Sequence, residues 1–254
     1  MRKAVERVSE IPESGAIVEK ARAVTAPALS TVTPVFANKN NSKGRAASKR
    51  SVDQRDRIMN AAFECFSAYG YDSASTREIA KRAGASHTKV LYHFSSKESL
   101  WLATMEKSIG NYINRMETDL NGVPTTSASE ALRVFIRDFV LFSAAYPGVH
   151  RILSMESTQG TERLNWLIDR YIRKHFNTVR DLIRLGQIEG EVRDGDPVRL
   201  YYLIISAGAA PFTLSWEYRT LTGRDVFSEA EVYQTIGFIY SVIFSRTDGV
   251  AETG

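Results

Sequence analysis

The feature that most constrains this fold is a pair of short helical segments joined by a glycine turn, within STREIAKRAGASHTKVLYHFSSKESL at residues 75–100. Ser75 followed by Glu78 predicts a capping box at the start of the first segment. Gly84 permits the left-handed backbone conformation that a tight turn requires, and Ser86 caps the second segment. Two short helices around such a turn are typical of a helix-turn-helix, whose second helix enters the DNA major groove.

The second of these helices carries polar side chains of the kinds that contact DNA. Val90 and Phe94, four residues apart, share a face, so we expect them and part of Leu91 to face the core. The remaining positions offer an ammonium group, hydroxyls and imidazoles, which hydrogen-bond to base edges and phosphate oxygens. The predicted DNA contacts on this helix are His87, Thr88, Lys89, Tyr92 and His93.

Lys97 is predicted to bind phosphate beside that helix. It follows Ser96 at the first position of the next helix, where a cation opposes the helix dipole unless an anion is bound. The alternative is an exposed lysine paired with Glu98 or an earlier acid. The other expected DNA contacts are Arg50, Thr76 and Arg77.

A longer pattern containing these helices resembles the DNA-binding signature of the TetR family of transcriptional regulators. Its residues are Ile58, Ala61, Ala62, Phe66, Gly70, Tyr71, Ile79, Ala80, Ala83, Gly84, Ser86, Phe94, Ser96, Lys97, Glu98 and Leu100. The family often has tyrosine five positions after the cap serine, whereas this chain has Leu91 there and Tyr92 next. That variant resembles a branch of the family that includes the pyrimidine-utilisation regulator.

The rest of the chain has helical periodicity, so the expected fold class is all-α. We expect about nine helices, forming an N-terminal three-helix helix-turn-helix domain and then a helical domain for ligand binding and dimerisation. The helix capped by Ser96 should end near Leu120, and Asp196-Pro197 is a strong helix start. Later helices are expected at 127–145, 148–156, 161–189, 197–221 and 228–246. The expected divisions are a disordered basic tail (1–50), the DNA-binding domain (51–97), the helical domain (98–247) and a disordered C-terminus (248–254).

The resemblance also implies partners and a ligand. It implies a homodimer formed by the last two helices, binding to a palindromic double-stranded DNA operator, and a repressor released by a small-molecule effector. Residues proposed to contact that effector are Met105, Ile109, Tyr112, Phe142, Arg151, Met155, Trp166, His175, Phe212 and Trp216. Ordinary core packing remains open for the apolar members, and a surface position or salt bridge for the polar ones.

Charge is concentrated near the N-terminus. Residues 1–50 hold 10 Lys and Arg against 4 Asp and Glu, although the whole chain has 33 against 29. This basic tail is either a solvated segment or a phosphate contact, and both interpretations remain open. If the tail dominated binding, the chain would be a non-specific or architectural DNA-binding protein, which is the alternative function.

Other classes of protein find little support in the sequence. The single cysteine, Cys65, excludes an internal disulfide, and it lies on an apolar helix face where it is expected to be inert core. His150 and His175 are isolated and are interpreted as satisfied or surface residues, so we expect no metal site and no cofactor. No catalytic motif is found, and we expect no enzyme activity. The longest apolar run, 203–214, is too short to span a membrane, so a soluble, cytoplasmic protein is expected.

Overall fold

The computed structural model describes residues 46–110, 112–113 and 127–245, and these residues form an all-α fold. Within them the only strand-like feature is an isolated antiparallel bridge between Val192 and Phe244. The all-α prediction is therefore confirmed. No helix in the described ranges is both long and apolar enough to cross a membrane. Most of the basic tail, the end of the helix expected near Leu120 and the C-terminal segment lie outside the described residues.

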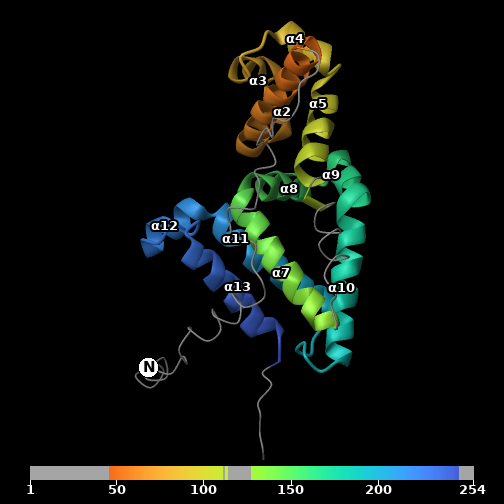
Figure 1. The fold of residues 1–254 in the computed structure, drawn as a ribbon, viewed down its shortest axis with the longest axis vertical. Coiled ribbons are helices and arrows are strands. Elements are labelled where there is room, and N and C mark those ends of the chain that lie inside the picture. The colour runs from red at the N-terminus through yellow and green to blue at the C-terminus, as the bar shows by residue number, and fades with distance from the viewer. Residues whose placement is uncertain (1–45, 111, 114–126, 246–254) are drawn as a thin grey trace, which may run out of the picture.

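Three helices form an N-terminal unit that we call the head. They are α2 (Ala46–Ser73), α3 (Thr76–Arg82) and α4 (His87–His93), which lie at the top of Figure 1. Helix α2 begins at Ala46, before the expected start at 51, because alanine and basic residues with good helix propensity precede that position. Gly70 has φ 75°, so the regular helix is interrupted there, as expected. Cys65 is buried in α2, as expected for a core thiol.

The capping box expected at the start of α3 does not form. Ser75 Oγ accepts a hydrogen bond from the backbone N–H of Arg77 at 3.3 Å, but Glu78 does not reach back to the cap. The carboxylate of Glu78 instead accepts from Arg82 Nε at 3.0 Å, one turn later on the same helix. An i,i+4 arginine therefore competes successfully for the acid that the capping motif requires.

A continuous helix connects the head to the rest of the molecule. It consists of α5 (Lys97–Met105) and a π-helical turn, η2 (Glu106–Gly110). The reciprocal capping pair occurs here: Ser96 Oγ accepts from the N–H of Ser99 at 3.0 Å, and Ser99 Oγ accepts from the N–H of Ser96 at 3.1 Å. This start of α5 fixes the direction in which the helix leaves the head.

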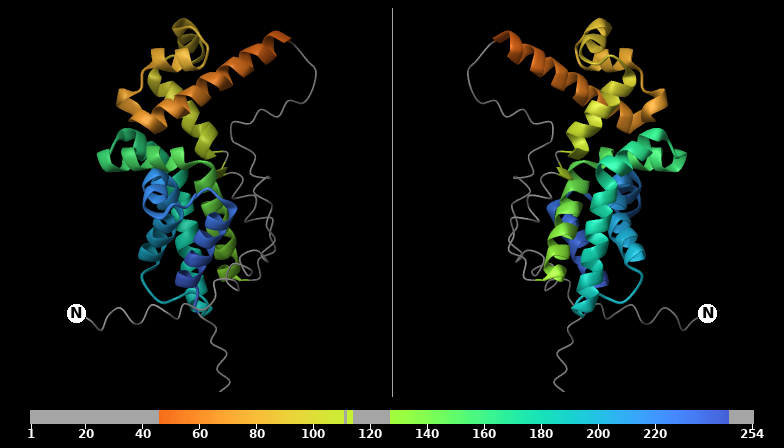
Figure 2. Two further views of the ribbon diagram at one scale, coloured as in Figure 1. Left: turned by 90° about the vertical axis from the view of Figure 1, so that its left-hand side faces the viewer. Right: turned by 90° about the vertical axis from the view of Figure 1, so that its right-hand side faces the viewer.

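The remaining helices form a larger unit that we call the body (Figures 1 and 2). Helix α7 packs against four others, α8, α10, α11 and α13. The helix expected over 197–221 is divided at Leu214, after Pro211 has removed one backbone donor from its last turn. The body elements are α7 (Ala128–Ala145), α8 (Pro147–Gln159), α9 (Glu162–Leu167), η3 (Ile168–Ile172), α10 (Arg173–Ile188), α11 (Pro197–Thr213), α12 (Ser215–Thr222) and α13 (Glu229–Ile243).

Candidate DNA-binding surface and ligand cavity

Helix α4 presents polar groups on a helix that is fixed by its opposite face. Val90 is 1% exposed and Phe94 is 4% exposed, as the spacing predicted. Thr88 and Lys89 are exposed, and the side chain of Tyr92 is 83% exposed. The outer face of α4 therefore offers a hydroxyl, an ammonium and a phenol to a partner.

Leu91 was expected to face the core only in part, and it is 45% exposed. Leu91 therefore adds an apolar contact to the outer face of α4. Next to it, His93 is half-buried and its ring lies edge-on to Tyr92 at a centroid distance of 5.3 Å.

Two of the predicted DNA contacts are bonded to each other. Thr76 Oγ1 lies 3.0 Å from His87 Nε2, which joins the first turn of α3 to the first turn of α4. Arg77 is exposed beside them. Arg50 lies in α2, but its side chain is outside the described residues. The Thr76–His87 bond links α3 to α4 in addition to placing two polar groups near the outer face.

Lys97 does not extend freely from the start of α5. Its Nζ donates to the backbone carbonyl of Asp72 at 3.0 Å and lies 4.5 Å from the centre of the Tyr71 ring. Burial lowers the pKa of Lys97 from its usual value, with the charge of Asp72 acting in the opposite direction. The ammonium therefore already has one partner at the end of α2, although it retains donors for a phosphate.

Tyr71 joins the head to the body through two cations. The guanidinium of Arg163, in α9, lies 3.8 Å from the ring centre, and Lys97 contacts the same ring. Arg163 Nε also donates to Glu156 at 3.1 Å, and the hydroxyl of Thr161 donates to the same carboxylate. Glu156 is 3% exposed, so the body positions Arg163 through a buried ion pair.

Helix α8 lies between the head and the long helices of the body, as Figure 1 shows. At Gly148 an added Cβ would come within 2.9 Å of the Phe63 ring of α2, so α8 and α2 are in close contact. Met155 was expected to touch a ligand. Its sulfur instead lies beside Gly70, 3.3 Å from where a Cβ would be. This face of α8 therefore packs on the head.

The neighbouring face of α8 lines a cavity of about 540 Å³ inside the body. Helices α7, α9, α10 and α11 complete it with mainly apolar and aromatic side chains, together with residues that follow α5. This volume and lining are typical of sites for small molecules. The predicted ligand contacts that line it are Ile109, Tyr112, Phe142 and His175.

The other predicted ligand contacts lie elsewhere. Met105 and Phe212 are fully buried in the core, and Trp166 packs edge-on against Trp101. Arg151 is exposed, and Trp216 is 83% exposed. Like Met155, these residues do not line the cavity, because helical spacing identifies an apolar face without showing whether a neighbouring side chain or a cavity lies against it.

His150 is a cavity residue that sequence reasoning missed. Its Nε2 lies 2.9 Å from Ser143 Oγ, and its ring packs edge-on against Phe139 and Phe142 at 5.5 and 5.9 Å. Burial lowers the pKa of His150 to about 4, so the imidazole is neutral at physiological pH. The available sequence signal was its position one turn before Leu153 on the same helix face.

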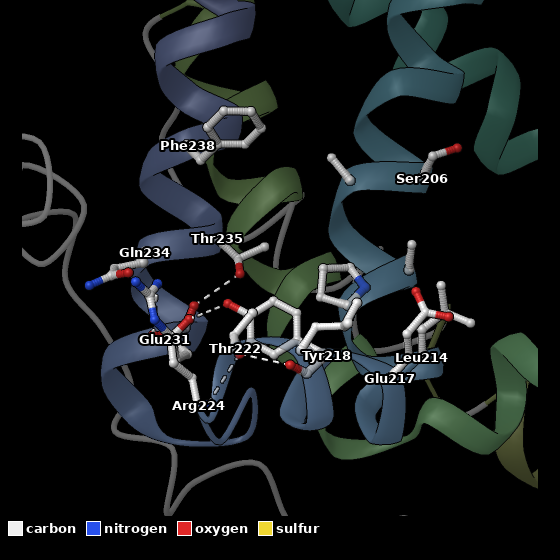
Figure 3. A pocket seen from close by; sticks show the side chains of 14 residues that line it. Ser206, Leu214, Glu217, Tyr218, Thr222, Arg224, Glu231, Gln234, Thr235 and Phe238 are labelled. Atoms are coloured by element: carbon white, nitrogen blue, oxygen red, sulfur yellow. Dashed lines mark hydrogen bonds and ion pairs between the residues drawn. The ribbon is translucent and has the colours of Figure 1, made fainter. Parts of the chain in front are cut away.

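A second hollow, of about 620 Å³, lies between α11, α12 and α13. Figure 3 shows Phe238 of α13 and Ser206 of α11 on opposite sides of it. At its base Tyr218 donates to Glu231 at 2.6 Å, and Arg224 lies 3.6 Å from the same carboxylate. Phe238 is 62% exposed, so this groove has an uncovered apolar wall.

Comparison with known families gives two matches that together cover most of the chain. A family model described as bacterial regulatory proteins, tetR family, matches residues 58–104. A second model, described as a tetracyclin repressor-like C-terminal domain, matches residues 129–243. The first match contains α3, α4 and nearly all of α5. The second contains the groove and the cavity lining apart from Ile109, Tyr112 and Ile113.

Individual relatives are regulators of several kinds. The chain is 27% identical over 143 residues to the fatty acid metabolism regulator protein of Bacillus subtilis, covering 56% of this chain and 73% of that protein. It is 24% identical over 186 residues to the transcriptional regulator RutR of Escherichia coli K12, covering 73% and 86%.

Solved structures share the fold. The ketosteroid transcriptional regulator KstR2 of Mycobacterium tuberculosis aligns with a TM-score of 0.63 at 19% identity, covering 83% of this chain and 99% of that chain. FadR from Bacillus subtilis in complex with stearoyl-CoA aligns with a TM-score of 0.55 at 22% identity, covering 74% and 98%. At these identities the likeness establishes the fold alone.

Proposed function

The chain belongs to the TetR family of bacterial regulatory proteins, and we propose that it is a dimeric repressor whose operator affinity is controlled by a small molecule in the body cavity. Proteins of this family are DNA-binding transcriptional regulators that dimerise and bind small molecules. The matched families are regulators rather than enzymes. Operator binding, the effector site and the residues that make these contacts are proposed.

The outer face of α4 is the observation that carries the proposal. Lys89 can donate to guanine O6 and N7, and Thr88 can contact a thymine methyl group. Tyr92, His93 and Lys97 are placed to contact phosphate, which sets the register of the helix without reading sequence. Since Val90 and Phe94 fix the other face of α4, these groups are presented on a rigid element.

Operator recognition is tested with DNA from the chain's own promoter region and a shuffled duplex of equal length, by fluorescence anisotropy at physiological salt. The wild type should prefer the promoter, and Lys89→Ala should weaken that binding by about 1–3 kcal/mol. Arg184→Ala, an exposed position on α10, removes the same charge far from α4 and serves as control. Equal affinity for both duplexes would contradict sequence-specific regulation.

Deletion of residues 1–45 separates this function from non-specific coating of DNA. The deletion leaves α2 complete, because that helix begins at Ala46. We expect preference for the promoter to be retained, with a lower affinity and a weaker salt dependence if the tail contacts phosphate. Loss of all DNA binding would favour the architectural alternative.

The dimer is assigned to the α11–α13 face, with a second copy of this chain as the occupant. Phe238 is 62% exposed there, and the groove of Figure 3 lies between the two helices. Phe238→Glu should convert the dimer to a monomer in light scattering and weaken binding to a palindromic duplex, while circular dichroism stays helical. A dimer of unchanged stability would place the interface elsewhere.

Effector control is assigned to α8, because this helix serves both units. Val149, His150 and Leu153 line the cavity, whereas Gly148 and Met155 contact α2 of the head. A ligand that alters the position of α8 would change the spacing of the two heads in a dimer. The difference in its affinity for the two head spacings sets the size of the change in operator affinity. A compound that binds the body but leaves operator affinity unchanged would contradict this coupling.

A further inference from the structure

One polar group at the cavity wall, the imidazole of His150, is held by a hydrogen bond of defined direction. Ser143 lies inside α7, is fully buried, and its hydroxyl donates to the carbonyl of Phe139 at 2.8 Å. A hydroxyl has one proton, and a carbonyl can only accept, so that proton is already used. Ser143 Oγ must therefore accept from His150 Nε2, which lies 2.9 Å away.

This arrangement fixes the tautomer of His150. With the proton on Nε2, the neutral ring has a lone pair on Nδ1, which makes no hydrogen bond to a described residue. The rings of Phe139 and Phe142 confine the imidazole from two sides. Nδ1 is therefore an acceptor without a described partner on a residue that lines the cavity.

The rest of the lining defines what that molecule can be. No aspartate or glutamate from the described parts of the chain lines the cavity, and most contacts come from aliphatic and aromatic side chains. Arg173 belongs to the lining, but it is 63% exposed and already paired with Asp169 at 2.8 Å. A carboxylate placed against Nδ1 would meet a lone pair in apolar surroundings, which is costly.

We propose that the cavity binds a neutral, apolar alcohol or phenol whose hydroxyl donates to Nδ1 of His150. This inference rests on the proposed function, because it specifies the effector class for the same cavity. Ser143 acts as a positioning residue: it orients the imidazole and does not contact the ligand. A site built to pair a hydroxyl discriminates strongly against analogues that lack it.

Three probes of equal skeleton test the proposal by isothermal titration calorimetry on the full chain at pH 7. They are 4-hexylphenol, its methyl ether 4-hexylanisole, and 4-hexylbenzoate. The phenol should bind about tenfold more tightly than either analogue, as expected for one hydrogen bond in an apolar site. An ether or benzoate that binds as tightly as the phenol, or no binding by any probe, would overturn the proposal.

Two variants test whether the preference for the phenol over the ether depends on His150 and Ser143. His150→Phe should reduce the phenol-to-ether ratio to within about twofold while keeping ether affinity, since the apolar walls remain. Ser143→Ala should lower the phenol-to-ether ratio, because the tautomer of His150 is no longer fixed by a hydrogen bond to Ser143. This variant tests the proposal even if His150→Phe does not fold. Ser154→Ala, on the exposed side of α8, is the matched control and should keep the wild-type ratio. A ratio unchanged in both test variants would overturn the assignment of Nδ1.

Operator binding measured in the same samples separates the two proposals. Release of promoter DNA by the benzoate and not by the phenol would overturn this inference and leave effector control standing. Selective phenol binding without any release of DNA would leave the inference standing and overturn effector control by this cavity.

Discussion

The head and the body place their functional side chains on opposite sides of their helices. In the head, polar groups of α4 face outward and the apolar face is only an anchor. In the body, the candidate site is internal, and its walls are the same kinds of apolar side chains that fill the core. A site on an outer helix face can therefore be recognised in the sequence from polar residues at helical spacing. A site inside the body cannot, because its residues have the same apolar helical spacing as the core.

The two regions meet at Tyr71, where a cation from each side contacts one ring. A substitution at this junction is the most direct test of how strongly the two regions are coupled. Arg163→Ala should destabilise the chain by about 3 kcal/mol, because Glu156 is left buried without its ion-pair partner. Urea unfolding gives the free energy.

Arg173→Ala is the control for that change, since its ion pair with Asp169 is exposed on both sides and should contribute less than about 1 kcal/mol. If the two variants unfold at the same urea concentration, the junction does not join the regions energetically.

The second largest effect concerns the interior of the body. Folded His150 has a pKa of about 4, whereas an unfolded histidine binds its proton near 6.5. Between these values the unfolded chain binds more protons, so the free energy of unfolding should fall as the pH drops from 6.5 to 4. The expected loss is roughly 2–3 kcal/mol.

His150→Phe isolates this contribution, because the carboxylates titrate in both proteins. The unfolding free energy of the wild type minus that of the variant should fall as the pH drops toward 4, whichever protein is the more stable at pH 7. A pH-independent difference would mean that the imidazole is charged or solvated in the folded body.

A smaller effect is expected at the outward site. Thr76→Val keeps the shape of the side chain but removes the hydrogen bond to His87 that joins α3 to α4. We expect a loss of about 1 kcal/mol in stability and a weaker preference for the promoter duplex. Unchanged DNA preference would show that the helix-turn-helix angle is fixed by apolar packing alone.

The smallest effect is expected at Lys97, on the border between the two regions. Lys97→Ala should lower the salt dependence of DNA binding by about one phosphate contact, equally for promoter and shuffled duplexes. Its contact with Asp72 adds only a modest loss of stability, because the side chain is half-buried. An unchanged salt slope would assign Lys97 to the junction and remove it from the DNA surface.

Much of the head could be predicted from the sequence, because short-range signals determine it. The start of α3 after Ser75, the cap at Ser86 and the burial of Val90 and Phe94 depend on residues a few positions apart. The error there came from competition, because Arg82 takes the acid expected in a capping box. Asp72 takes one donor of Lys97, whose contact with phosphate stays a prediction. The assignment of individual residues to DNA stays a prediction.

The cavity could be predicted only in part. Ile109, Tyr112, Phe142 and His175 line it, but Met105, Phe212 and Trp166 fill the core although their spacing is equally helical. His150 also lines it, and we propose that it defines the ligand class, but the sequence analysis interpreted it as a satisfied or surface residue. Its meaning depends on Ser143, seven positions earlier on a different helix.

The sequence by itself determined the helices, their order, the family and the outward face of α4, because periodicity, caps and turns act locally along the chain. Only the tertiary structure decided which apolar helix faces line a cavity and which pack against other side chains. It also placed Arg163 against Tyr71 and paired the imidazole of His150 with the hydroxyl of Ser143. Those properties arise where helices distant in sequence meet, and no local pattern specifies the contacts made there.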